Sequence, residues 1–143
     1  MKISDVLRGK GTEVVTITPE ATVSELLRLL AEHNVGALVV SADGNSVAGI
    51  VSERDVVRLM HADPAGFQTQ VRSIMTAEVQ TCDPDAHIED LMRLMTNRRI
   101  RHVPVVVDGT LTGIVSIGDV VKSRIGELEF EREQLSKYIA SSG

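Results

Sequence analysis

Two hydrophobic patterns follow one another in the first half of the chain. Leucines recur at helical spacing between residues 23 and 33, and this period predicts an amphipathic helix over Val23–His33. An unbroken apolar run, Ala37–Val40, comes next and indicates a strand that is buried on both faces. Asp43-Gly44 is a hairpin turn signal, and it predicts that the run Val47–Val51 returns as a neighbouring strand.

The same order of patterns recurs in the second half. A helix is predicted over Ile88–Arg99, then a buried strand over Val103–Val107, a turn at Asp108-Gly109 and a returning strand over Thr112–Val115. In each half a short strand precedes the first helix, and a second helix, opened by a serine, follows the last strand. The two short strands are predicted over Val14–Ile17 and Val79–Cys82, and the two serines are Ser52 and Ser116.

The two halves are copies of one unit. Gly49–Val57 matches Gly113–Val121 at seven of nine positions, and Thr16-Ile-Thr-Pro19 is echoed by Thr81-Cys-Asp-Pro84. Repetition of this kind indicates a repeated supersecondary unit. We therefore predict an α/β (α+β) fold with the order strand, helix, strand, strand, helix in residues 1–70 and again in residues 71–125.

Neither unit is large enough to be comfortably stable alone. About 60 residues bury too little surface, so the halves are expected to pack face to face around a pseudo-two-fold axis. Asp63–Gln70, which contains a proline and a glycine, reads as the linker between them. Val71–Met75 mirrors Ile3–Leu7, and each is predicted to form a short helix ahead of its repeat.

The helix ends carry further signals. Thr22 and Glu25 predict a capping box, whereas His87 is a weaker N-cap. Residues 126–143 continue the helical pattern as a C-terminal tail, in which Gly126 predicts a break or kink. The sparse apolar stripe of this tail predicts that it packs on a second copy, giving a homodimer. The alternative is a charged helix that lies on its own unit.

Composition and charge argue against several classes of function. Aromatic residues make up only 2% of the chain, which argues against a base-stacking platform, and the net charge of −5 argues against nucleic acid or an anionic membrane as partner. The single cysteine, Cys82, excludes an internal disulfide and a cluster of thiolate metal ligands. No apolar stretch approaches the ~18 residues of a membrane span. The first residues lack the apolar run of a signal peptide, so a cytoplasmic location is predicted.

Signatures of catalysis are also missing from the sequence. The four histidines do not have the spacing of metal ligands, and there is neither a GxSxG elbow nor a glycine-rich phosphate loop. We therefore predict no catalytic residue, no metal and no catalytic cofactor.

The repeated unit resembles the CBS domain, the family named from cystathionine β-synthase. The resemblance rests on the Thr-x-x-Pro turns, the apolar strands and the two Gly-Ile-Val-Ser-x-x-Asp segments, and it covers roughly residues 1–124. Two such repeats resemble a CBS pair, or Bateman module, of the stand-alone bacterial and plant organellar kind. The resemblance implies a non-catalytic sensor of energy or redox state. It would bind an adenosyl ligand (AMP, ADP, ATP, sometimes NAD or S-adenosylmethionine) in clefts between the repeats and signal to an unidentified effector protein.

The Ser-x-x-Asp segments have a chemistry that suits a nucleotide. Ser52 and Ser116 open a helix, where free backbone N–H groups and the helix dipole favour a phosphate. Asp55 and Asp119 lie three residues further on, and a carboxylate can accept both hydroxyls of a ribose. The alternative is a capping box that only stabilises the helix start. The resemblance favours ribose binding by at least one of the two carboxylates.

Basic side chains distinguish the second half from the first. Arg101 and His102 stand where the first half has Gly36 and Ala37, and the resemblance implies that they reach the phosphates. For Arg99, phosphate contact and a solvated helix end are equal alternatives. The other residues expected at the ligand are Arg54, which faces the cleft; Gly118, which leaves room; Val15, Thr16, Val79 and Thr81, which would bracket the adenine; and Pro104 in the second buried strand.

A rival function stays open at this point. Gly36 and Ala37 leave half of the site without basic residues, so the pair could also be an interaction module that has lost its ligand. Nucleotide affinity distinguishes the two.

Overall fold

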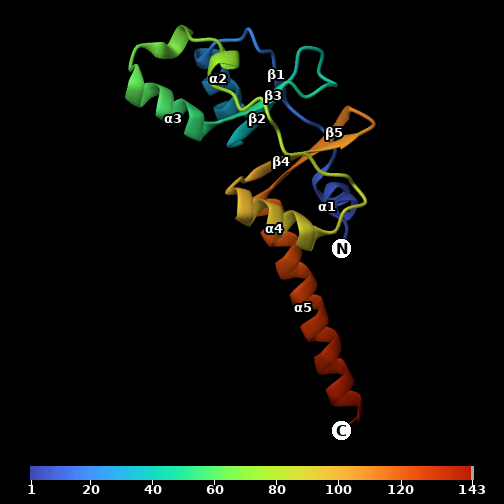
Figure 1. Cartoon of the computed structure of the whole chain (residues 1–143). Coiled ribbons are helices and arrows are strands. Elements are labelled where there is room, and N and C mark those ends of the chain that lie inside the picture. Colours follow the sequence, from blue (N-terminus) through green and yellow to red (C-terminus); the bar gives the residue numbers. More distant parts are fainter. Residues whose placement is uncertain (143) are drawn as a thin grey trace.

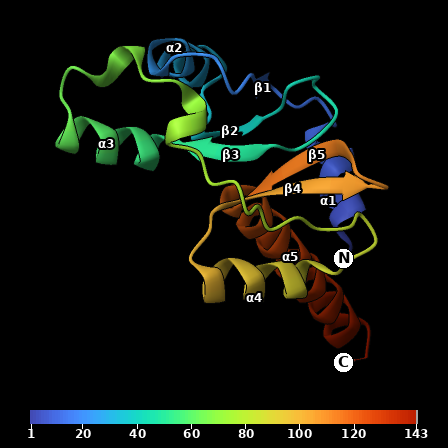
Figure 2. The same cartoon turned by 45° about the horizontal axis from the view of Figure 1, so that its top comes forward.

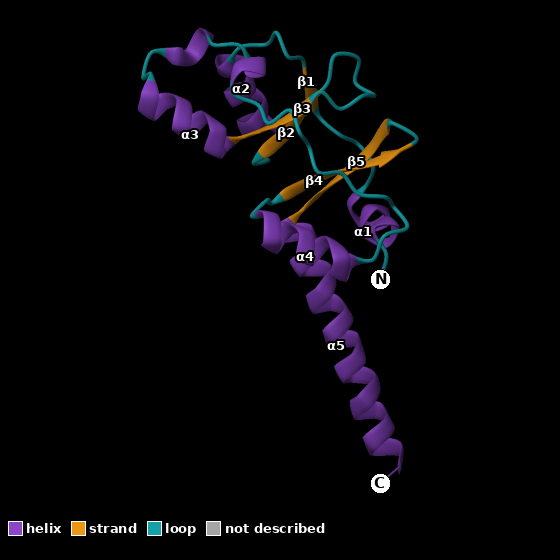
Figure 3. Cartoon of the chain, in the orientation of Figure 1, coloured by secondary structure: helices purple, strands orange, loops and turns teal. Residues whose placement is uncertain are grey.

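The structure is a computed structural model that describes residues 1–142, and it divides into two similar halves, each with a small sheet and covering helices (Figure 1). The mixture of helices and strands in both halves confirms the predicted α/β (α+β) fold class (Figure 3). The elements are, in chain order, α1 (Ile3–Lys10), β1 (Thr16–Ile17), α2 (Val23–His33), β2 (Ala37–Val40), β3 (Gly49–Ser52), α3 (Glu53–Ala62), the short 3₁₀ helices η1 (Gly66–Gln68) and η2 (Val71–Ser73), α4 (Ile88–Arg98), β4 (His102–Val107), β5 (Thr110–Ser116) and α5 (Ile117–Ser142).

The first half folds around β2, which lies between the parallel β1 and the antiparallel β3. All four residues of β2 are buried, which explains its unbroken apolar sequence. The hairpin predicted from Asp43-Gly44 is present, and a long loop joins its strands, since Val40 pairs with Gly49. Asp43 holds this loop together: its carboxylate accepts hydrogen bonds from the backbone N–H groups of Asn45 and Ser46.

In the second half, β4 and β5 form an antiparallel hairpin. Its turn is as predicted, since Asp108 and Gly109 both have positive φ and lie between the paired Val107 and Thr110. Positive φ at both central residues is the geometry that matches the twist of the flanking strands. The same Asp-Gly signal therefore lies in a long loop in the first half and in a two-residue turn in the second.

The strand predicted over Val79–Cys82 is wrong. Only Cys82 pairs, in a single parallel bridge in which its N–H donates to the Pro104 carbonyl over 3.0 Å and its carbonyl accepts from the Val106 N–H over 3.0 Å. A longer parallel ladder would need a backbone N–H at position 104, and proline has none. In the first half, β1 pairs at two positions, Thr16 and Ile17. In the second half, Pro104 limits the pairing to Cys82.

The helix starts agree with the predictions in part. The Thr22 hydroxyl accepts from the Glu25 N–H over 3.3 Å, but the Glu25 carboxylate bonds to Arg28 instead of completing the predicted box. An arginine one turn along offers a stronger, charge-assisted partner than the backbone. His87 makes no side-chain cap, as predicted.

Each half has its own core, and each core takes its lead-in segment from the other repeat. Ile3, Val6 and Leu7 of α1 pack in the second core, with α4, β4 and β5, and α1 lies beside this sheet in Figure 2. Val71 of η2 packs in the first core. Equivalent backbone hydrogen bonds hold both lead-in segments in place: the Ile3 N–H donates to the Ala86 carbonyl, and the Val71 N–H donates to the Ala21 carbonyl. The two repeats are therefore interlocked.

Gly49 and Gly113, which occupy equal places in the repeats, allow this exchange. A methyl group at Gly49 would lie 2.7 Å from the Met75 sulfur and 2.8 Å from the Thr76 carbonyl oxygen. At Gly113 it would lie 2.9 Å from a methyl carbon of Leu7. The glycine of each Gly-Ile-Val-Ser segment is thus where the other repeat's lead-in segment approaches the sheet.

The last helix, α5, runs without interruption from Ile117 to Ser142 and leaves the body of the molecule (Figure 1). The predicted break at Gly126 is wrong, since α5 continues through this residue as one α-helix. Gly143, the last residue of the predicted tail, lies outside the described residues. Within residues 1–142, no helix has the length and apolar character needed to cross a bilayer.

Candidate functional site

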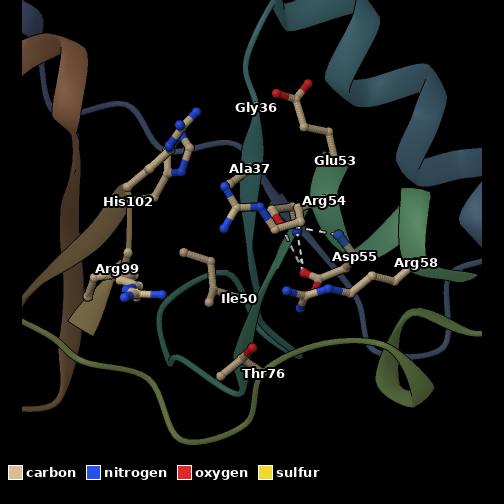
Figure 4. A pocket seen from close by; sticks show the side chains of 13 residues that line it. Gly36, Ala37, Ile50, Glu53, Arg54, Asp55, Arg58, Thr76, Arg99 and His102 are labelled. Atoms are coloured by element: carbon tan, nitrogen blue, oxygen red, sulfur yellow. Dashed lines mark hydrogen bonds between the residues drawn. The ribbon is translucent and has the colours of Figure 1, made fainter. Parts of the chain in front are cut away.

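A cleft of about 240 Å³ lies between the halves (Figure 4). It is formed where β2 begins, where β3 passes into α3, and where the chain passes from α4 to β4. Thr76, after η2, closes one side through its backbone bridge to Ile50. The lining residues are Gly36, Ala37, Ile50, Ser52, Glu53, Arg54, Asp55, Arg58, Thr76, Arg99, Ile100, Arg101 and His102.

Half of the expected ligand residues meet in this cleft. They come from both repeats and are Gly36, Ala37, Ser52, Arg54, Asp55, Arg99, Arg101 and His102. The other half do not line it: Val15, Thr16, Val79, Thr81, Pro104, Ser116, Gly118 and Asp119. Among these, Val15 packs against the first core and Pro104 is buried in β4, which removes their side chains from the cleft.

Five lining residues were missed: Ile50, Glu53, Arg58, Thr76 and Ile100. Arg58 had a sequence signal, because it follows Arg54 by four positions and so shares its helix face. Thr76 had none, since its place depends on the exchange of lead-in segments.

Asp55 is held in a fixed orientation at the start of α3. Its Oδ2 accepts from the Ser52 N–H over 2.8 Å and from the Ser52 hydroxyl over 3.1 Å, and its own N–H donates back to that hydroxyl (Figure 4). Within residues 1–142 the other oxygen, Oδ1, has no hydrogen-bond partner. The capping box is therefore present and still leaves one carboxylate oxygen for a ligand.

Four arginines line the cleft: Arg54, Arg58, Arg99 and Arg101. Figure 4 places Arg99, from the end of α4, across the cleft from Arg58 of α3. None of the four forms an ion pair or a side-chain hydrogen bond with any residue in the described part of the chain. Facing only Glu53 and Asp55 as acids, they give the cleft an excess of positive charge, which suits an anion.

His102 lies between the halves, with its ring against the backbone of the first repeat. A methyl group at Gly36 would lie 3.5 Å from its Cε1 and 3.4 Å from Oε1 of Glu53. Burial lowers the pKa of His102 below its ordinary value of 6.5, and Lys10 and Arg101 add to this, while Glu53 and Asp119 oppose it. The imidazole is therefore neutral at pH 7 and has one N–H to donate.

The equivalent place in the second repeat is built differently. Ser116 and Asp119 repeat the same capping box. Lys10, the last residue of α1, donates to Asp119 Oδ2 over 2.6 Å and to the Ile114 carbonyl over 2.8 Å. Burial alone would raise the pKa of Asp119, but the bonds from Lys10 and Ser116 outweigh it and the pKa lies below 3.8.

Lys10 and Asp119 also line a separate groove of about 560 Å³ between α1 and α5. This groove includes Phe130 but neither Ser116 nor Gly118. It is therefore not the counterpart of the first cleft.

Metal and thiol chemistry have little support in this fold. Among the described residues, no three His, Cys, Asp or Glu side chains come together as a metal site. Burial, with a smaller effect from Asp83, raises the pKa of the Cys82 thiol to about 12. A thiol with that pKa is a poor nucleophile at neutral pH.

Comparison with known proteins gives the family. The CBS domain family matches residues 3–62 and 71–126. The CBS domain-containing protein CBSX3, mitochondrial, of Arabidopsis thaliana is 39% identical over 96% of this chain and 71% of its own length. The crystal structure of the CBS-domain containing protein ATU1752 from Agrobacterium tumefaciens has a TM-score of 0.83 at 43% identity, covering 87% of this chain and 99% of that one.

A more distant structure shares the fold. It is the CBS domain pair of protein MJ0100 in complex with 5′-methylthioadenosine and S-adenosyl-L-methionine, with a TM-score of 0.78 at 24% identity, covering 89% of this chain and 98% of that one. The two family matches and the close relatives agree with the resemblance first read from the repeat. The chain belongs to the CBS domain family and is a tandem CBS pair.

Proposed function

We propose that the protein is a non-catalytic regulatory module that binds an adenosyl nucleotide, AMP, ATP or NAD, in the cleft between its repeats. The observation that carries the proposal is the meeting of Asp55 with four arginines, two from each repeat, that form no ion pair within residues 1–142. A ribose needs an acceptor for its hydroxyls, and phosphates need cationic donors. The MJ0100 pair, which holds adenosyl ligands, supports the same class of ligand.

In the proposed complex, the free Oδ1 of Asp55 accepts from the ribose hydroxyls. The arginines and the neutral His102 donate to the phosphate oxygens, since guanidinium groups bind them with two parallel hydrogen bonds. The adenine contacts come from Ile50, Thr76 and Ile100, which replace the four strand residues expected from the sequence.

Signalling follows from where the cleft lies. Its arginines come from both repeats, so a bound anion joins the two halves and favours the arrangement in which they are close. A ligand that binds one arrangement more tightly shifts the population toward it. An effector protein in the cytoplasm would recognise this arrangement as a report of energy or redox state. The division into repeats 1–70 and 71–125 and a tail 126–143 is retained in this proposal.

The test is thermal unfolding with AMP, ADP, ATP, NAD, NADH and S-adenosylmethionine added separately. A ligand at 100 times its Kd should stabilise the fold by about 2.7 kcal/mol. Asp55→Ala should abolish the shift. Asp119→Ala is the matched control, because it removes the same capping box and should keep the shift. An unchanged shift in Asp55→Ala would contradict the ribose assignment.

The second candidate is an interaction module without a ligand. It is favoured by the Lys10–Asp119 pair, which takes up the carboxylate of the second repeat. If none of the six compounds stabilises the fold, this candidate replaces the first. Sustained turnover of any of them would contradict the non-catalytic assignment.

We also propose a homodimer formed through α5. Val121, Leu128 and Leu135 follow one another at seven-residue spacing along this helix and are 47%, 48% and 60% exposed. A seven-residue apolar repeat is typical of helices that pair along their length. A second copy offers the same stripe, so the contact is self-complementary about a two-fold axis.

A further inference from the structure

The two Ser-x-x-Asp segments are equal in sequence but have different neighbours. At Asp55 no cation pairs with the carboxylate anywhere in residues 1–142. At Asp119 the Lys10 ammonium lies 2.6 Å from Oδ2, the same oxygen that accepts from the Ser116 N–H and hydroxyl. The charge of the second carboxylate is therefore already balanced by an ammonium group, and within residues 1–142 only its Oδ1 is left without a hydrogen-bond partner.

The difference comes from the exchanged lead-in segments. In the first half, Thr76 pairs with Ile50 by two backbone hydrogen bonds of 2.9 and 3.0 Å and sends no side chain to Asp55. In the second half, the carbonyl of Ile114, the counterpart of Ile50, accepts from Lys10 over 2.8 Å. An ammonium group has three donors, and two of them are used on atoms at the second site.

The packing of α1 holds Lys10 beside Asp119. It ends α1, whose Ile3, Val6 and Leu7 are buried in the second core. The Lys10 side chain is only 33% exposed and that of Asp119 24%. The pair is thus partly shielded from water, where a charge-assisted bond is stronger than at the surface.

The rest of the second site is poor in groups for a phosphate. Gly36 stands in place of Arg101, Ala37 in place of His102, and Gly118 in place of Arg54. Lys122, the counterpart of Arg58, keeps a positive charge, and Arg101, whose carbonyl accepts from the Ile117 N–H as that of Gly36 accepts from the Glu53 N–H, holds the counterpart place of Gly36. A nucleotide would therefore have to displace Lys10 and would gain fewer phosphate contacts than in the first cleft.

We propose that Lys10, held beside Asp119 by its bonds to Oδ2 and to the Ile114 carbonyl, occupies the space that a ribose would need there and closes the second site, so that the pair binds one nucleotide. The inference rests on the proposed function for the identity of the ligand. It adds the number of nucleotides that one chain binds. Lys10 acts as a specificity-determining residue: it makes two sites of the same motif unequal.

The experiment is isothermal titration of the full chain with AMP. The wild type should bind one AMP per chain. Lys10→Met keeps the length of the side chain and removes its charge, and it should bind a second AMP about tenfold or more weakly than the first, because Gly118 stands there in place of Arg54. Lys10→Arg, the matched control, should still bind one. Two AMP per wild-type chain, or one per Lys10→Met chain, would overturn the inference.

A double variant separates this inference from the proposed function. Lys10→Met with Asp119→Ala should lose the second AMP and keep the first. If the wild type binds no AMP, the proposed function fails for AMP. In that case, one AMP bound by Lys10→Met and lost in the double variant would still support the block at Asp119, and no binding by either variant would overturn it. Thermal unfolding of each variant shows that it is folded.

Discussion

At the scale of single residues, Asp55 and Asp119 show how neighbours decide the chemistry of a side chain. Both cap a helix through the same three hydrogen bonds to a serine. Asp119 has Lys10 beside it, and Asp55 lies in a cleft with four arginines that form no ion pair within residues 1–142. The capping interpretation and the ligand interpretation are therefore not exclusive, since the cap uses Oδ2 of Asp55 and leaves Oδ1.

The arginines give the first prediction. Arg99→Ala or Arg101→Ala should weaken AMP binding by about 10–100-fold, because a hydrogen bond between charged groups contributes ~1.5–3 kcal/mol. Adenosine, which has no phosphate, should bind both variants as it binds the wild type. Arg98→Ala is the control, since Arg98 is exposed one position away and does not line the cleft. Equal losses for AMP and adenosine would place these arginines away from the phosphate. Titration calorimetry measures both ligands.

His102 gives a prediction about pH. Its pKa is lowered by burial and then by Lys10, so the unfolded chain binds a proton more readily than the folded one. The protein should lose stability as the pH falls below 6.5, the ordinary value, and His102→Gln should lose less over this window. Glu53 and Asp119 act in the opposite direction on His102 and weaken the effect without reversing it.

Urea unfolding between pH 7.5 and 5 measures this change. His33→Gln, at an exposed position on α2, is the control and should follow the wild type. Asp119 adds a separate loss of stability at lower pH, below 3.8, because the pKa of its carboxyl group is lower in the folded chain than in the unfolded one. A wild-type curve that is flat from pH 7.5 to 5 would contradict the effect of His102.

At the scale of elements, the two repeat glycines differ in what they face. Gly49→Ala would press a methyl group against the Thr76 carbonyl oxygen as well as Met75. Gly113→Ala meets only the end of the Leu7 side chain, which can move. Overpacking costs ~1–3 kcal/mol, and we expect Gly49→Ala near the top of this range and Gly113→Ala near the bottom. Urea unfolding of the two variants compares them directly, and a larger loss in Gly113→Ala would contradict the assignment.

Elements with a local cause could be predicted from the sequence. The bounds of α2 and β2 follow from the leucine period and the unbroken apolar run, and the Asp108-Gly109 turn follows from its backbone preference. The missing strand at Val79–Cys82 could not be found by looking at that segment. Its cause is Pro104, which lies on the neighbouring strand.

The candidate site also contains some residues that the local sequence predicts and others that it does not. Half of the expected residues line the cleft because the repeat itself places them, and Arg58 follows from helix geometry. Lys10 carried no signal, since it lies 109 positions from Asp119 and reaches it only through the exchange of α1. Contacts created by exchange have no trace in local periodicity.

At the scale of the whole molecule, this exchange joins the two cores. Each core contains residues from the other repeat, so neither half can unfold and leave the other intact. Ile3→Ala should cost ~2–5 kcal/mol, as is usual for a buried isoleucine. It should shift a single transition rather than split it. Hydrogen exchange should show protection falling in both halves, and loss confined to the second half would contradict the coupling.

The assembly of the whole molecule depends on how α5 is covered. The helix has 26 residues and is about 39 Å long at ~1.5 Å per residue. Its outer part leaves the body with Leu128 and Leu135 exposed, which a second copy would bury. We expect the wild type to sediment at twice 15.5 kDa. Leu128→Glu with Leu135→Glu should sediment as a monomer, because four carboxylates cannot be buried in one helix pair without a large desolvation cost.

Lys137→Glu is the matched control, since it places a new acid on the same exposed part of α5 but off the seven-residue stripe. This variant should remain a dimer at the concentrations used for the wild type. The double variant should keep its affinity for AMP, because neither leucine lines the cleft. A dimer that survives the double variant would assign the contact to another face, and a monomeric wild type would remove the homodimer from the proposed function. Retained AMP binding by a monomeric variant would show that the nucleotide site is complete within one chain, as the lining residues require.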